Sequence, residues 1–249
     1  IERVRHINDA VQHLELAVTD TSLRKMKAGQ SLLVRFIDSD DEVERWDPYL
    51  RQQWWPVGVT RSGTLLVERP ASERLEPRQY LSLLGPIGEP YRFRRSLRNV
   101  LLVAYNTSPT PLLMAVPALL GNKVQVTMVL LGTARSYNTS HLHPELEIIL
   151  GGDGLEWPDQ VMTFGWADQV FAVTAPDDEL LYMSRLMQAV RDKRHDIPRN
   201  YIFGVFQSAL ACGTGACYAC ALRTNKGLTL TCTDGPALDL TRLVLPTTL

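Results

Sequence analysis

The sequence carries almost no net charge and has no long uninterrupted apolar run. Its 249 residues include 26 Lys and Arg and 27 Asp and Glu, for a net charge of -1, so composition gives no sign of nucleic acid or an anionic membrane as a partner. The least charged stretch, residues 99–132, is interrupted by Lys123 and by the polar, proline-containing segment 106–111. A direct membrane span is therefore not expected.

Motifs that would identify an activity directly are also missing. No cationic segment followed by an apolar one stands at the start, so a signal peptide is not expected. The sequence has no G-x-G-x-x-G turn, Walker loop or nucleophile elbow, and no internal repeat. Its 45% apolar content is that of a globular protein able to bury a core.

Cysteine is scarce, and its four copies all lie near the C-terminus, between Cys212 and Cys232. A secreted disulfide framework would spread its cysteines along a chain of this length. Clustering in one glycine-rich segment indicates a metal site in a reducing compartment. We therefore predict a cytoplasmic protein, with a peripheral position on a membrane-bound complex left open.

The first part of the chain has the pattern of short strands broken by turns. Alternating or hairpin-like segments predict strands at residues 11–18, 31–36, 56–59 and 63–68. Short strands at this spacing favour a small antiparallel β-barrel, which we assign to residues 1–96. The acidic stretch 38–44 is predicted to be a solvated loop.

From residue 97 buried strands alternate with helices. Apolar runs predict strands at 100–104, 124–131, 146–150 and 169–173, and helices over 112–120 and 179–193. Such alternation favours a parallel sheet with right-handed crossovers, so we predict a nucleotide-binding-like α/β domain over residues 97–203. Residues 204–249 are rich in Gly, Cys and Thr, and we expect a small C-terminal module there.

The cysteine spacing is C-x4-C-x2-C-x11-C, formed by Cys212, Cys217, Cys220 and Cys232. The first three match the plant-type [2Fe–2S] pattern, in which a more distant fourth cysteine completes the site. Gly213 and Gly215 let the backbone curl so that amides point at sulfur. We predict that these four thiolates hold a [2Fe–2S] cluster.

Three other interpretations of the cysteines stay open at this point. A structural zinc site would favour two C-x(2–4)-C knuckles, and Cys232 stands alone. Two disulfides would be strained across a loop of this size and would suit a different compartment. Free buried cysteines would not need the two intervening glycines.

Residues 211–220 (Ala-Cys-Gly-Thr-Gly-Ala-Cys-Tyr-Ala-Cys) and 232–236 (Cys-Thr-Asp-Gly-Pro) resemble the C-terminal module of the electron-transfer subunit of heteromeric dihydroorotate dehydrogenase. That family lies in the ferredoxin–NADP reductase-like superfamily, and its order of barrel, α/β domain and cluster module fits the whole chain. The resemblance implies FAD on a flavin-binding-type barrel, NADH at the α/β domain, a [2Fe–2S] cluster and a catalytic partner subunit.

The flavin-binding stretch departs from the family pattern. A family barrel strand carries Arg-Pro-x-Ser at the flavin, whereas residues 54–59 read Trp-Trp-Pro-Val-Gly-Val here. Trp55 takes the Arg position and Gly58 the Ser position, although a flavin pyrophosphate needs donors or positive charge. The weak flavin candidates are Arg51, Trp54, Trp55, Pro56, Val57 and Gly58, and packing is the competing interpretation for the two tryptophans.

The nucleotide-binding stretch departs further. The family has a glycine-rich turn ending in Ala-Pro-Leu after the first α/β strand, but residues 104–112 contain no glycine and keep only Pro111-Leu112. Thr107, Ser108 and Pro111 remain weak nucleotide candidates, with helix capping as the alternative role for the two hydroxyls. Residues 174–176 (Thr-Ala-Pro) replace a family Cys-Gly-Pro near the nicotinamide. The NADH site is thus predicted to be degraded.

Intact cluster ligands beside altered nucleotide sites predict an electron-transfer subunit of a multi-subunit oxidoreductase rather than a self-sufficient enzyme. One alternative is a functional NADH-accepting FAD/[2Fe–2S] reductase subunit of the dihydroorotate dehydrogenase type. A second is a structural docking subunit whose cluster stabilises the fold. The expected partners are protein subunits of a redox complex.

His141 and His143 suggest a metal site, but no third ligand lies near them in the sequence. A surface loop is the preferred interpretation for both.

Overall fold

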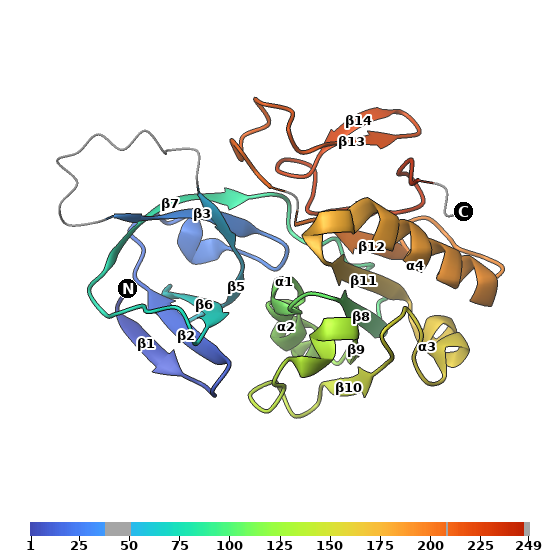
Figure 1. The fold of residues 1–249 in the computed structure, drawn as a ribbon, viewed down its shortest axis with the longest axis horizontal. Helices are drawn as coiled ribbons and strands as arrows, with labels where there is room; N and C mark the ends of the chain where they lie inside the picture. Colours follow the sequence, from blue (N-terminus) through green and yellow to red (C-terminus); the bar gives the residue numbers. More distant parts are fainter. Residues whose placement is uncertain (38–50, 208, 247–249) are drawn as a thin grey trace.

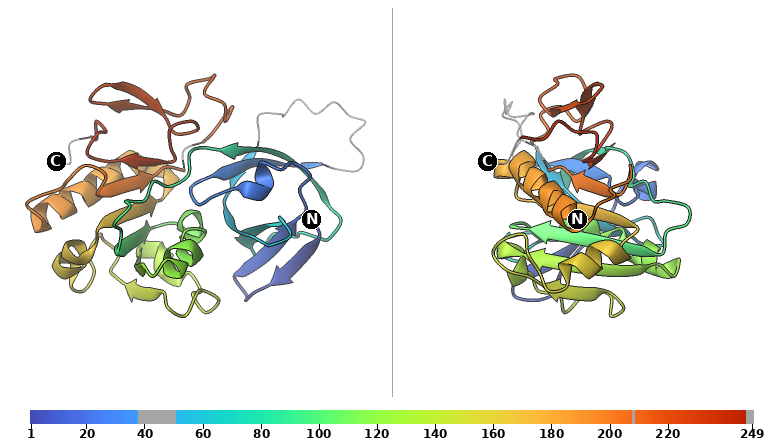
Figure 2. Two further views of the ribbon diagram at one scale, coloured as in Figure 1. Left: turned by 180° about the vertical axis from the view of Figure 1, so that it is seen from behind. Right: turned by 90° about the vertical axis from the view of Figure 1, so that its right-hand side faces the viewer.

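The computed structural model describes residues 1–37, 51–207 and 209–246, so the predicted acidic loop at 38–44 lies outside the described residues. Figure 1 shows the N-terminal strands on one side and the layered α/β part on the other. The β13–β14 hairpin lies at the top of every ribbon view and β10 at the bottom (Figures 1 and 2). No helix in the described part of the chain is long and apolar enough to span a membrane.

The N-terminal part consists of two antiparallel sheets that share one core. The sheet orders are β1-β2-β6-β5 and β4-β3-β7. Inward-facing residues alternate along the strands, so that Leu14 of β2 lies opposite Val67 of β6 in the register and both are fully buried. The described strands here are β1 (Arg3–His6), β2 (Val11–Leu16), β3 (Ser31–Ile37), β4 (Gln52–Trp54), β5 (Pro56–Val59), β6 (Leu65–Pro70) and β7 (Tyr80–Ile87), with the short helix η1 (Leu23–Lys25).

The second part is built on a six-stranded sheet with the order β10-β9-β8-β11-β12-β15. Its strands are parallel except β15, which pairs antiparallel with β12. The chain moves outward from β8 on one side and from β11 on the other, so the strand order reverses between these two. The strands are β8 (Asn99–Tyr105), β9 (Gln125–Leu131), β10 (Glu147–Leu150), β11 (Gln169–Thr174), β12 (Ile202–Val205) and β15 (Ala237–Asp239).

Helices cover both faces of this sheet, which explains why its strands are apolar throughout. Leu102 of β8 packs in the core formed with α1 and α2, whereas Leu101 and Val103 pack in the core formed with α3 and α4. The helices are α1 (Thr110–Leu113), α2 (Val116–Gly121), α3 (Gln160–Trp166) and α4 (Glu179–Lys193), with the short helices η2 (Gly132–Ser136) and η3 (Pro176–Asp178). These features confirm the predicted fold class.

The helix predicted over residues 112–120 is wrong in one respect, because the structure divides it into α1 and α2. Pro117 has no N–H to give to the carbonyl four residues earlier, and its ring disfavours a continuous helix. It sits instead in the first turn of α2, where a missing N–H costs little.

The C-terminal segment begins with the cysteine loop and continues as a hairpin of β13 (Ala221–Thr224) and β14 (Gly227–Leu230). After Cys232 the chain returns to the main sheet as β15. The cysteine segment is therefore held at both ends by the six-stranded sheet.

Candidate functional site

The first three cysteines lie on one tight loop between β12 and β13, and Cys232 follows β14. Gly213 and Gly215 have φ values of 69° and 79°, in the left-handed region that favours glycine. A Cβ on Gly213 would stand 2.9 Å from the Cδ1 atoms of both Leu33 and Ile87. These glycines therefore allow the loop to curl and to lie directly against the barrel.

The four thiols form two pairs. The sulfur atoms of Cys220 and Cys232 are 3.3 Å apart and buried. Cys212 and Cys217 contact each other through their side chains, and this pair lies nearer the surface, with Cys217 exposed. All four cysteines are free of disulfides.

Backbone amides point at these sulfur atoms. The N–H of Thr214 lies 3.4 Å from the Cys212 sulfur, and hydrogen bonds from the backbone at Thr214 and Cys217 lower the pKa of Cys212 to about 6. Burial raises the pKa of Cys220, but hydrogen bonds from Cys232 and Thr231 outweigh it and lower that pKa overall. Burial and the Cys220 thiol raise the pKa of Cys232 to about 11.

This arrangement fits a [2Fe–2S] cluster better than zinc. Four thiolates around one tetrahedral zinc would place every pair of sulfurs about 3.8 Å apart, given a Zn–S bond of about 2.3 Å. Across the described residues, no three cysteine sulfurs lie within 4.8 Å of one another. Two separate pairs match two irons with two thiolates each, and amide donors to sulfur are a feature of such sites. A cluster held here takes up and releases one electron at a time.

A cavity of about 560 Å³ lies between the barrel and the carboxyl ends of the sheet strands. Of the weak candidates, Trp55, Thr107, Ser108 and Pro111 line it. Arg51 and Trp54 do not line it. The Arg51 guanidinium donates to Ser82, and Trp54 is 1% exposed in the barrel core.

The remaining flavin candidates, Pro56, Val57 and Gly58, form β5 at the edge of the barrel sheet. Val57 lines a separate, smaller cavity. All three nucleotide candidates thus line the cavity, whereas Trp55 is the one flavin candidate among its described lining residues.

The start of α1, where a phosphate would be expected, offers few backbone N–H donors. Pro109 and Pro111 have no N–H, the Thr110 N–H donates to the Ser108 hydroxyl, and the Leu112 N–H donates to the Pro109 carbonyl. Helix α1 therefore begins without the free amides that bind phosphate elsewhere. Arg69 is the single basic side chain among the described residues lining the cavity, and it is paired with Glu73.

Gln207 spans the point where the strand order reverses, which is where sheets of this type bind nucleotides. Its side-chain amide donates to the Thr107 hydroxyl at 3.3 Å and to the Thr174 carbonyl at 3.1 Å. Asn106 takes a left-handed φ of 54° in place of a glycine and accepts a hydrogen bond from the Thr133 N–H. The crevice is thus crossed by the chain's own side chains.

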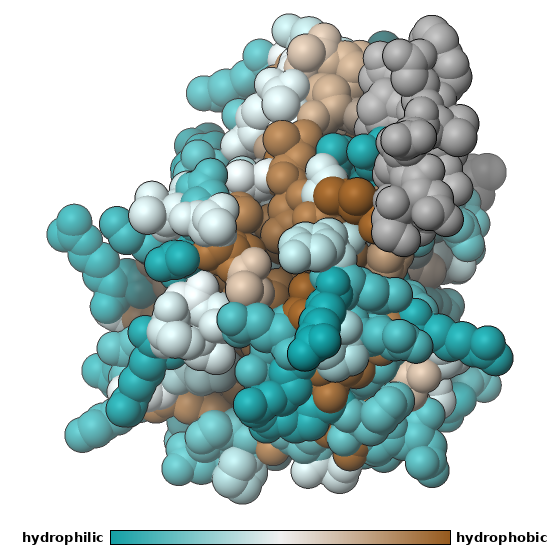
Figure 3. Space-filling view, turned by 90° about the vertical axis from the view of Figure 1, so that its left-hand side faces the viewer, coloured by the Kyte–Doolittle hydropathy of each residue, from teal (hydrophilic) through white to brown (hydrophobic). Residues whose placement is uncertain are grey.

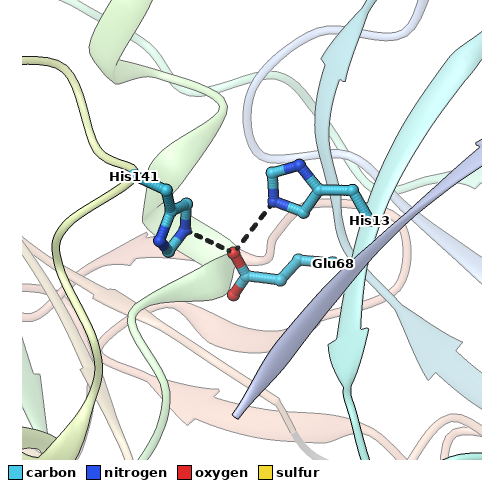
Figure 4. Close-up of side chains that lie close together, drawn as sticks. All are labelled: His13, Glu68 and His141. Atoms are coloured by element: carbon cyan, nitrogen blue, oxygen red, sulfur yellow. Dashed lines mark hydrogen bonds and ion pairs between the residues drawn. The ribbon is translucent and has the colours of Figure 1, made fainter. Parts of the chain in front are cut away.

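A second cluster of polar residues was missed by sequence reasoning. The prediction that His141 lies in a surface loop is wrong. Its side chain is 11% exposed and lies beside Glu68 of β6 and His13 of β2 (Figure 4). His143 is exposed. No local spacing signals this group, because its three members come from distant parts of the chain.

Comparison with known proteins agrees with the cysteine geometry. Residues 207–244 match the iron–sulfur cluster binding domain of dihydroorotate dehydrogenase B. The electron transfer subunit of dihydroorotate dehydrogenase B (NAD(+)) from Shouchella clausii is 25% identical over 97% of this chain and 96% of its own length. The subunit of the same name from Clostridium perfringens is 22% identical over 64% of each chain.

Solved structures share the fold. The NADH-dependent reduced ferredoxin-NADP oxidoreductase matches with a TM-score of 0.71 and 17% identity, over 98% of this chain and 89% of the other. The ferredoxin reductase in carbazole 1,9a-dioxygenase matches with a TM-score of 0.56 and 11% identity, over 84% and 65%. The resemblance inferred from the cysteine segment is thereby confirmed: the chain is similar to electron transfer subunits of dihydroorotate dehydrogenase B, over 97% of its length in one case and 64% in the other.

Proposed function

We propose that the chain is an electron-transfer subunit that relays single electrons through a [2Fe–2S] cluster on Cys212, Cys217, Cys220 and Cys232, without a working NADH site. The proposal rests on a contrast between two sites. The four cysteines form two pairs and receive backbone hydrogen bonds, whereas helix α1 at the crevice has no free N–H groups at its start. Hydride transfer needs a bound nicotinamide or flavin, whereas a cluster moves one electron at a time.

The cysteine loop has the exposure that a relay requires. The buried pair, Cys220 and Cys232, packs with Leu33 and Ile87 of the barrel, while Cys217 and Tyr218 are exposed at the rim. A cluster here would be covered on the barrel side and accessible to a partner protein at the exposed Cys217. The four free thiols also suit a reducing compartment such as the cytoplasm.

Protein partners are part of this proposal. Figure 3 shows the barrel side of the molecule, where apolar side chains form a band with hydrophilic ones on its left and below it. Exposed apolar side chains on one face of β3 and β7 include Ile37, Tyr80 and Leu84. Exposed apolar patches of this kind are typical of protein interaction sites, which supports assembly into a multi-subunit oxidoreductase.

The test is a cofactor inventory of the purified chain, joined to spectroscopy and a dye assay. We expect two irons and two sulfides per chain, an electron paramagnetic resonance signal on mild reduction, and no rapid dye reduction from NADH. The Cys217→Ser variant should lose the signal, and the exposed Thr233→Ser variant should keep it. Rapid NADH-driven dye reduction by the isolated chain would refute the relay, and a cluster that cannot be reduced would favour a structural role.

A bound flavin is a second candidate, favoured by the cavity of about 560 Å³ that Trp55 helps to line. We propose that any FAD binds there, with its pyrophosphate held by groups other than the start of α1. Flavin absorbance in the purified chain that is lost in Trp55→Ala would support this. A flavin-free chain that takes up no added FAD would refute it without affecting the cluster proposal.

A further inference from the structure

We propose that His13, Glu68 and His141 bind one divalent transition-metal ion of the zinc type at the junction of the barrel and the α/β part. This site is separate from the cysteine cluster and does not depend on the proposed electron relay.

The three ligand atoms already converge. His13 and Glu68 are cross-strand neighbours on β2 and β6, and His141 reaches them from the segment between η2 and β10 (Figure 4). Glu68 Oε2 lies 3.1 Å from His141 Nε2 and 3.5 Å from His13 Nε2, and the three atoms all lie within 4.8 Å of one another. Zinc bonds of about 2.0–2.1 Å in a tetrahedron separate ligand atoms by roughly 3.3–3.4 Å.

The state of these groups suits a cation. The Glu68 side chain is 3% exposed, and its carboxylate has no Lys or Arg partner among the described ion pairs. His13 Nε2 faces the carboxylate, is buried, and has no hydrogen-bond partner. A cation between the three residues would satisfy this nitrogen and balance the buried negative charge.

Further residues hold the carboxylate in place. The Tyr137 hydroxyl donates to Glu68 Oε2 and the Thr110 hydroxyl donates to Glu68 Oε1, both at 2.8 Å. Hydrogen bonds of this kind orient metal ligands and tune their affinity.

Three protein ligands leave one coordination position for water. A cavity of about 140 Å³ borders all three residues and is otherwise lined by His143 and by apolar side chains such as Leu113 and Leu146. Two imidazoles and one carboxylate select zinc-type ions over Mg²⁺, which prefers oxygen ligands. Because Glu68 and His141 come from different parts of the fold, the ion would also hold the barrel against the α/β part.

The test is zinc binding to the full chain with its cluster assembled. Titration calorimetry and elemental analysis should give one zinc per chain with iron and sulfide unchanged, and no comparable Mg²⁺ binding. His141→Ala and Glu68→Gln should weaken zinc binding by at least about 100-fold. His195→Ala, a matched change at an exposed histidine that does not line this cavity, should bind as the parent does.

Tyr137→Phe tests the site without changing a ligand, in case the ligand variants fail to fold. It removes one hydrogen bond to Glu68 and should weaken zinc binding about 10-fold or more, with an unchanged circular dichroism spectrum and iron content. No zinc binding by the parent, equal binding by His141→Ala, or zinc uptake accompanied by iron loss would each overturn the proposal.

Discussion

Glu179 gives the sharpest prediction about stability, because a buried carboxyl group there has no cationic partner among the described ion pairs. It begins α4, is 7% exposed, and accepts a hydrogen bond from the Gln207 N–H at 2.6 Å. Burial raises the pKa of Glu179 to about 8, against an ordinary value of 4.5. The backbone hydrogen bond opposes this rise without cancelling it.

The sign of the effect follows from proton binding. Below pH 4.5 Glu179 is protonated in both the folded and the unfolded chain, so its burial does not lower the free energy of unfolding there. Between pH 4.5 and 8 only the folded chain holds it, and the free energy of unfolding falls by about 1.4 kcal/mol per pH unit. The total loss by pH 8 is roughly 3–5 kcal/mol.

The Glu179→Gln variant should remove this slope, because an amide keeps the acceptor oxygen and does not titrate. We expect parent and variant to be equally stable near pH 4.5 and the variant to be more stable at pH 8. Urea unfolding of the cluster-loaded chain at several pH values, followed by tryptophan fluorescence, measures the difference. Glu76→Gln, at an exposed position, is the control. A Glu179→Gln variant that keeps the parent's slope, or is less stable than the parent at pH 8, would refute the reasoning.

Two further predictions concern packing. Gly213→Ala should cost about 1–2 kcal/mol for its left-handed backbone and about 1–3 kcal/mol for overpacking against Leu33 and Ile87, and should lower the iron retained per chain. Gly227→Ala is its control, because a Cβ there meets nothing within 4 Å. An equal decrease in the free energy of unfolding in both variants would contradict the predicted overpacking at Gly213. Leu102→Ala, at a fully buried position of β8, should lower the free energy of unfolding by about 2–5 kcal/mol in denaturant titrations, and a loss below 1 kcal/mol would contradict its central place in the sheet.

The sequence predicted the elements whose pattern is local. The continuous apolar run of β8 and the amphipathic turns of α4 are present as expected. Strand β7 was not predicted as a strand, because Gly85 and Pro86 within Tyr80–Ile87 have the composition of a turn. Strand β15 has only three residues, and its pairing with β12 depends on the chain returning from the hairpin.

The two candidate metal sites also differ in whether a local sequence pattern reveals them. Three of the four cysteines lie on one loop, so their spacing alone indicates the cluster. His13, Glu68 and His141 become neighbours only after β2 pairs with β6 in one register and the α/β part packs against the barrel. A shift of that register by one residue would move His13 to the other face of the strand, and no local pattern fixes the register.

The crevice and the cluster loop are joined through Gln207. Its backbone N–H donates to Glu179, and its side chain donates to Thr107 and Thr174 at the ends of β8 and β11. These bonds fix the point from which the chain departs toward Cys212. A nucleotide at the reversal of strand order would need the same crevice and the same polar groups. Binding there would therefore compete with the anchoring of the cluster loop. This competition gives a physical reason for a chain of this fold to hold a cluster while its own side chains bridge the nucleotide crevice.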